Sequence, residues 1–91
     1  MNNTDLLIAQ GNTYREQHLP EMALEQYILA IAGDRNSASA FNNYGNVLRE
    51  LGDPWGAIPF NQRAVQLDPV TVTNQFNLAA AYLMSGDYVR G

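Results

Sequence analysis

Residues 11–34 read GNTYREQHLPEMALEQYILAIAGD, and residues 45–68 read GNVLRELGDPWGAIPFNQRAVQLD. At a spacing of 34 residues the two stretches share eight identities, which are Gly11/Gly45, Asn12/Asn46, Arg15/Arg49, Glu16/Glu50, Pro20/Pro54, Ala23/Ala57, Ala30/Ala64 and Asp34/Asp68. A fixed period of this length is typical of arrays in which each unit buries its apolar face only against the next unit. The sequence therefore predicts a stack of repeated units.

The composition excludes several classes of protein. Apolar residues make up 46% of the 91 residues and charged residues 15%, which favours an ordered domain over a disordered tail. The net charge is −4, and none of the five basic residues is a lysine, so we expect no nucleic acid or membrane partner. The chain has no cysteine, and its first apolar run, residues 6–9, is too short for a signal peptide. These observations predict a cytoplasmic protein.

Two helices are predicted in each period, because apolar residues recur at steps of three and four. Thr4 is the expected cap of the first helix, which should end near Gln17. Pro20 and Pro54 should begin the second helices, with Asp53 as a cap. Further helices should begin at residues 38 and 72. Pro59 falls inside the fourth helix, where it is expected to kink the axis and disturb the packing.

These residues resemble the tetratricopeptide repeat family over most of the chain. The residues that stand on that family's signature positions are Leu7, Gln10, Gly11, Tyr14, Ala23, Tyr27 and Ala30 in the first unit, Phe41, Tyr44, Gly45, Leu48, Ala57, Ala64 and Pro69 in the second, and Leu78, Ala79 and Tyr82 in the third. It implies an all-α, right-handed helix-turn-helix solenoid of five helices. About two and a half repeats form one domain over residues 1–91, with repeats at 4–37 and 38–71 and a partial repeat at 72–91. Gln10, Asn61 and Gln75 depart from the family pattern, which has apolar or aromatic residues there.

The third unit is expected to contain one helix and a turn, Ser85-Gly86-Asp87, that matches Leu51-Gly52-Asp53. Its helix is apolar on nearly every side, from Phe76 to Met84. Arrays of this type normally end in a helix with a polar outer face. We therefore expect the chain to be the amino-terminal piece of a longer protein, and the uncovered face to be buried by a second copy in a homodimer.

The resemblance also predicts a concave groove lined by the first helix of each repeat. Asparagine is frequent on this surface, and an amide can both donate to and accept from an extended peptide backbone. The asparagines are similar to those that the repeat superhelix of O-linked N-acetylglucosamine transferases presents. The residues predicted to bind a peptide are Asn12, Arg15, Asn42, Asn43, Asn46, Arg49, Phe76 and Asn77. The alternative is that these amides are solvated or link neighbouring helices, and that each arginine is neutralised by the glutamate that follows it.

The family's clamp for terminal carboxylates is excluded, because Ile8, Thr73 and Asn77 stand where that clamp has lysine or arginine. No catalytic, metal or cofactor site is expected: the single histidine, His18, lies in a predicted turn without clustered ligands. Trp55 is interpreted as a packing residue. The sequence therefore predicts a non-catalytic scaffold that binds a protein or peptide.

Two alternatives remain open. One is a self-association module. The other is the substrate-docking arm of a larger bacterial glycosyltransferase, suggested by residues 77–78, Gly86-Asp87-Tyr88 and Arg90-Gly91, which resemble the last repeat before a transferase domain.

Overall fold

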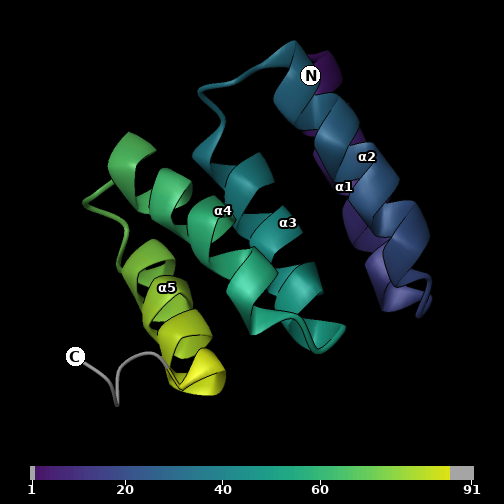
Figure 1. Cartoon of the computed structure of the whole chain (residues 1–91). Coiled ribbons are helices and arrows are strands. Elements are labelled where there is room, and N and C mark those ends of the chain that lie inside the picture. The colour runs from purple at the N-terminus through teal and green to yellow at the C-terminus, as the bar shows by residue number, and fades with distance from the viewer. Residues whose placement is uncertain (1, 87–91) are drawn as a thin grey trace.

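The computed structural model describes residues 2–86, which form five helices and no strand. The helices are α1 (Asn3–Glu16), α2 (Pro20–Gly33), α3 (Ala38–Glu50), α4 (Pro54–Leu67) and α5 (Val72–Ser85). They follow one another across the molecule in chain order, as helix-turn-helix pairs α1/α2 and α3/α4 with α5 beside α4 (Figure 1). The fold is thus the all-α helix-turn-helix solenoid that the resemblance to tetratricopeptide repeats implies.

The second helices begin and end where local sequence signals place them. α2 and α4 start at Pro20 and Pro54, since proline at the first helical position loses only an N–H that has no partner there. The carboxylate of Asp53 caps α4 by accepting from the N–H of Gly56 at 2.9 Å, as predicted.

The cap of α1 was wrongly predicted: Asn2, not Thr4, accepts from the N–H of Asp5 at 2.8 Å. Asparagine is the stronger cap of the two residue types.

The turn after each first helix contains one residue with a positive φ angle. In the second and third units this residue is glycine, Gly52 at 88° and Gly86 at 81°. In the first unit it is His18 at 63°, one period before Gly52. Left-handed backbone costs roughly 1–2 kcal/mol for a residue with a Cβ atom. The repeat therefore holds the histidine in a turn geometry that suits glycine.

Paired helices approach closely at one glycine in each complete repeat. A Cβ atom on Gly11 would lie 2.8 Å from Cδ1 of Tyr27, and one on Gly45 would lie 2.9 Å from Nδ2 of Asn61. Tyr27 and Asn61 are one period apart, and both are fully buried. Asn61, which departs from the family pattern, therefore packs beside Gly45 as Tyr27 packs beside Gly11, but with a smaller, polar side chain.

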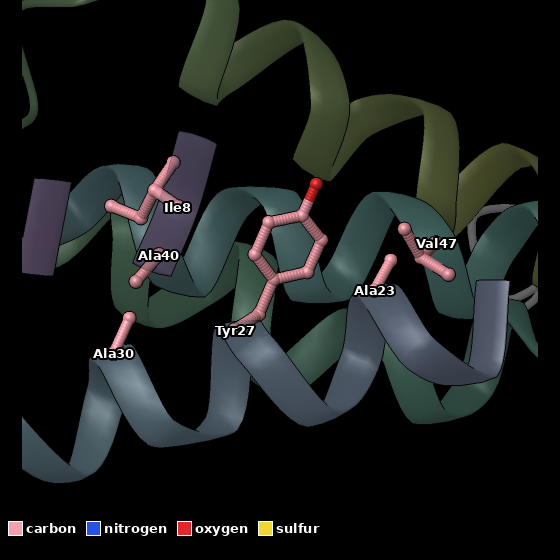
Figure 2. Close-up of a cluster of buried hydrophobic side chains, with 6 residues drawn as sticks. All are labelled: Ile8, Ala23, Tyr27, Ala30, Ala40 and Val47. Atoms are coloured by element: carbon pink, nitrogen blue, oxygen red, sulfur yellow. The ribbon is translucent and has the colours of Figure 1, made fainter. Parts of the chain in front are cut away.

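The main apolar cluster joins α1, α2 and α3. The Tyr27 ring lies between Ala30 and Ala40 on one side and Ala23 and Val47 on the other, with Ile8 nearby (Figure 2). Small residues around one large ring allow three helices to pack at short distance. Because α3 belongs to the second repeat, this cluster also joins the two repeats.

The packing disturbance expected around the fourth helix is not seen, while the kink at Pro59 stays a prediction. α4 runs from Pro54 to Leu67 without a break, and Pro59 lies on its exposed side. Ala57, Asn61 and Ala64, on the opposite side, are completely buried. Proline removes one backbone hydrogen bond from α4, and its position on the exposed side leaves the buried side of the helix intact. Asp87, Tyr88, Arg90 and Gly91, used in the sequence interpretation of the third turn and of a transferase junction, lie outside the described residues.

Candidate peptide-binding hollow

A hollow of about 630 Å³ lies between α1 and α3, the first helices of the two complete repeats. Its lining combines two amides, two carboxylates, a guanidinium and an imidazole, from Asn12, Arg15, Glu16, His18, Asn43 and Glu50. α1 ends at Glu16 and α3 at Glu50, so the last residue of each helix lines the hollow. Three of the predicted groove residues line it: Asn12, Arg15 and Asn43.

An ion pair between the repeats closes one side of the hollow. Arg15 donates from Nε to Glu50 Oε1 at 3.0 Å and from Nη2 to Glu50 Oε2. The hydrogen bond to Glu50 raises the pKa of Arg15 above its ordinary value. Arg15 is therefore neutralised by the glutamate of the next repeat rather than by Glu16, its neighbour in sequence. The two-point contact aligns α1 with α3 and holds the guanidinium in place.

The two amides of the lining each have one side engaged with the protein. Asn12 Oδ1 accepts from the Tyr27 hydroxyl at 2.5 Å, so the orientation of the amide is set by a buried ring. Asn43 Nδ2 donates to the hydroxyl of Ser39 at 3.4 Å, one turn earlier on α3. Within residues 2–86, nothing accepts from Asn12 Nδ2 and nothing donates to Asn43 Oδ1. The hollow thus presents a donor on one wall and an acceptor on the other.

Other predicted groove asparagines are buried between helices. Asn42 Oδ1 accepts from Asn61 Nδ2 and from Asn77 Nδ2, each at 3.2 Å, which links α3 to α4 and α5. Asn46 is also buried, and its Oδ1 has no hydrogen-bond partner among the described residues. These contacts correspond to the alternative that the amides link neighbouring helices. Peptide binding by Asn42, Asn46 and Asn77 stays a prediction.

The remaining two predicted residues lie away from the hollow. Arg49 donates from Nη1 to the backbone carbonyl of Asn77 at 3.0 Å, so it joins α3 to α5. Phe76 is 71% exposed on α5. The structure therefore brings together Asn12, Arg15 and Asn43 and leaves the other five predicted residues outside this hollow.

Three lining residues were absent from the predicted binding set: Glu16, His18 and Glu50. The sequence indicates Glu16 and Glu50 as neutralising neighbours of Arg15 and Arg49. Their spacing of 34 residues was the available signal, because it places both at the same helix end in successive repeats. His18 had been interpreted as a turn residue only. Its position at the hollow follows from the turn geometry and has no local sequence signature.

The side chains of the hollow offer hydrogen bonds and charge to a ligand. No group of three or more histidine, cysteine or acidic side chains able to hold a metal ion occurs in the described part of the chain. The six residues that line the hollow all carry hydrogen-bonding side chains, contributed from both α1 and α3 and from the turn after α1. Separately, none of the helices described within residues 2–86 has the length and apolar character needed to cross a membrane.

Comparisons with known proteins place the fold in context. No protein-family model matches the sequence. The chain is 33% identical over 76 residues to the protein O-mannosyl-transferase TMTC1 of Mus musculus and, over the same length, to that of Homo sapiens. The matches cover 84% of this chain but only 8% and 9% of those transferases.

A solved structure shares the fold. The crystal structure of MamA superimposes with a TM-score of 0.85 at 29% identity. The match covers 93% of this chain and 50% of the MamA chain. The chain thus spans half of that chain and less than a tenth of the two transferases.

Proposed function

We propose that this chain is a protein-interaction module that holds an extended polypeptide segment in the hollow between α1 and α3. The observation that supports this most is the pair of amides on opposite walls, with Asn12 offering a donor and Asn43 an acceptor. An extended backbone presents carbonyl and N–H groups along its length, and this pair can satisfy one of each without reading a side chain. Arrays of this fold serve in general as protein-interaction scaffolds. The cytoplasmic location stays a prediction.

The proposal is tested with a capped nonapeptide of glycine, serine and threonine, titrated into protein labelled with ¹⁵N. We expect side-chain amide signals of Asn12 and Asn43 to shift together. Asn43→Ala should weaken binding about three- to tenfold, because one hydrogen bond contributes roughly 0.5–1.5 kcal/mol. Asn36→Ala is the matched control, since Asn36 is exposed in the loop between α2 and α3. Equal affinity of the two variants, or no shift at any peptide concentration, would contradict the proposal.

Asn77 is less suitable than Asn43 for this test, although both were predicted to grip a peptide. Its amide donates to the buried Asn42, so replacing it also removes a link between α3 and α5. A loss of peptide binding in Asn77→Ala would therefore combine a stability effect with a binding effect. Asn43 has only its weak 3.4 Å contact with Ser39 to lose.

Self-association is a second candidate function, favoured by one face of α5. Val72, Phe76, Ala79 and Leu83 follow each other at steps of four, three and four, so they share one side of the helix. All four are exposed, and none of the 14 residues of α5 is charged. We propose that this face pairs with α5 of a second copy. An uncharged contact avoids the repulsion that a net charge of −4 would otherwise produce between copies.

The likeness to a mannosyl-transferase supports the third candidate, a docking arm of a larger glycosyltransferase. In this proposal the hollow would hold the acceptor polypeptide for a catalytic part located elsewhere in a longer protein. The residues beyond Gly91 in the parent sequence provide the test. Further 34-residue periods would favour a plain scaffold, whereas alternating strands and helices would favour the transferase arm.

A further inference from the structure

We infer that the polypeptide held between α1 and α3 carries a basic side chain, lysine or arginine, whose cationic group lies near the carboxylates of Glu16 and Glu50. This inference rests on the proposed function, because it specifies which segments the hollow selects. It concerns the ligand class and not the backbone contacts made by Asn12 and Asn43.

The charges of the lining are unbalanced. Two carboxylates, Glu16 and Glu50, face one guanidinium, that of Arg15. Arg15 is already committed, since both its Nε and its Nη2 donate to Glu50. Among residues 2–86 the exposed Glu16 carboxylate has no ion-pair partner. One negative charge at the hollow is therefore left to a ligand.

The backbone adds to this negative potential. Glu16 and Glu50 are the last residues of α1 and α3, so both helices direct their carboxyl-terminal ends at the hollow. The carboxyl-terminal end of a helix carries a partial negative charge, which disfavours a carboxylate there and favours a cation. A lysine or arginine of the ligand would relieve the unfavourable position of Glu16. The negative potential from the helix ends adds to that from the charged side chains and does not depend on their number.

An acidic ligand fits the hollow poorly. Binding a carboxylate through Arg15 would require breaking its two-point contact with Glu50. Arg49, the next arginine in the array, does not line the hollow and donates to the backbone of α5 instead. An anion would thus meet two carboxylates and no available guanidinium. The same argument disfavours a free carboxyl terminus as the bound group.

The test uses three capped nonapeptides of glycine, serine and threonine that differ only at the central residue, which is lysine, norleucine or glutamate. Norleucine keeps most of the lysine stem without its charge. We expect the lysine peptide to bind about two- to fivefold more tightly than the norleucine peptide, the range of a solvent-exposed ion pair. The glutamate peptide should bind most weakly, and the preference should shrink as salt is added.

Glu16→Gln should abolish the preference for lysine over norleucine. Glu25→Gln is the matched control, because it removes the same charge from an exposed site on α2 that does not line the hollow. An equal effect of both variants would mean that only net charge matters and would overturn the inference. Equal binding of the three peptides would overturn the inference but leave the proposed function standing. Failure of all three to bind would contradict the proposed function itself.

Discussion

At the residue scale, a single large side chain links the packing of the first repeat to its hollow. The Tyr27 ring fills the gap beside Gly11 and lies within the main apolar cluster. Its hydroxyl donates to Asn12 Oδ1 and so fixes the orientation of that amide, which lines the hollow. Changes at Gly11 or Tyr27 should therefore affect both stability and the orientation of Asn12.

Gly11→Ala should lower the free energy of unfolding by roughly 1–3 kcal/mol, the usual cost of overpacking. The added Cβ would lie 2.8 Å from Cδ1 of Tyr27, a ring that is packed on all sides and cannot move away easily. Gly33→Ala is the control, because the nearest atom to its Cβ, Oγ1 of Thr4, is 4.0 Å away. Urea denaturation of both variants measures the effect. A Gly11→Ala protein as stable as Gly33→Ala would show that the two helices are not in tight contact.

Stability should fall at alkaline pH because of Tyr27. Burial raises the pKa of its hydroxyl, so the folded chain holds this proton more tightly than the unfolded chain does. The resulting stabilisation is complete below the unfolded value of about 10 and is lost as pH rises through the higher folded value. Urea midpoints at increasing pH should decline less steeply in Tyr27→Phe than in the parent. Tyr44→Phe, which removes another phenol hydroxyl, is the comparison, and identical slopes in all three proteins would exclude Tyr27 as the cause.

At the element scale, polar contacts join helices of successive repeats at a spacing of one period plus one residue. Arg15 pairs with Glu50, and Asn42 bonds to Asn77, both across 35 residues. The first contact lies at the hollow and is partly exposed, while the second is buried among three helices. The first helices of the repeats are thus held in register by side chains that differ from one junction to the next.

Asn42→Ala should destabilise the junction of α3, α4 and α5 by about 2–4 kcal/mol. Its Oδ1 is the only recorded acceptor for the buried amides of Asn61 and Asn77 within the described residues, and each unsatisfied buried donor costs roughly 1–3 kcal/mol. Hydrogen exchange should accelerate most in α5, which depends on this junction. Asn36→Ala again serves as the exposed control. A loss no larger than that of the control would mean that the amide cluster does not stabilise the array.

At the scale of the whole molecule, the two ends of the array differ in chemistry. The outer side of α1 carries mostly polar side chains beside one exposed leucine, Leu6, and Gln10, Thr13 and Gln17 line a second hollow of about 440 Å³ there with Tyr14 and Gln26. The outer side of α5 is the apolar face of Val72, Phe76, Ala79 and Leu83. Stacking head to tail would bring an apolar face against a polar one. The difference favours contact between two α5 helices, which forms closed pairs rather than filaments.

The chain should therefore show a sedimentation coefficient that increases with concentration toward that of a dimer. Leu83→Glu should keep it monomeric, because Leu83 is 58% exposed within the apolar face of α5 and a charge there would be buried on pairing. Leu29→Glu, at an exposed leucine of α2, should leave the concentration dependence unchanged. A parent chain that sediments as a monomer at every concentration would contradict the pairing.

The repeat pattern alone was enough to predict the five helices, with most boundaries correct to within a residue. Pro20, Pro54 and Asp53 act through contacts within one or two turns, so their effect can be recognised without knowing what packs against them. The close approach at Gly11 and Gly45 was also predictable, because it recurs with the period. The wrongly predicted cap of α1, Thr4 in place of Asn2, moved that boundary by two residues.

The tertiary structure alone decided which polar residues are available to a ligand. Ile8, Asn42 and Phe76 are equivalent positions in successive repeats, yet the first two are buried and the third is exposed. Burial and pairing depend on the side chain of the neighbouring repeat, about 35 residues away, and these neighbours do not recur with the period. For this reason the amide oxygen of Asn42 is already hydrogen-bonded to neighbouring helices. Asn12 and Asn43, in contrast, line the hollow, and each amide keeps one hydrogen-bonding group without a partner among the described residues.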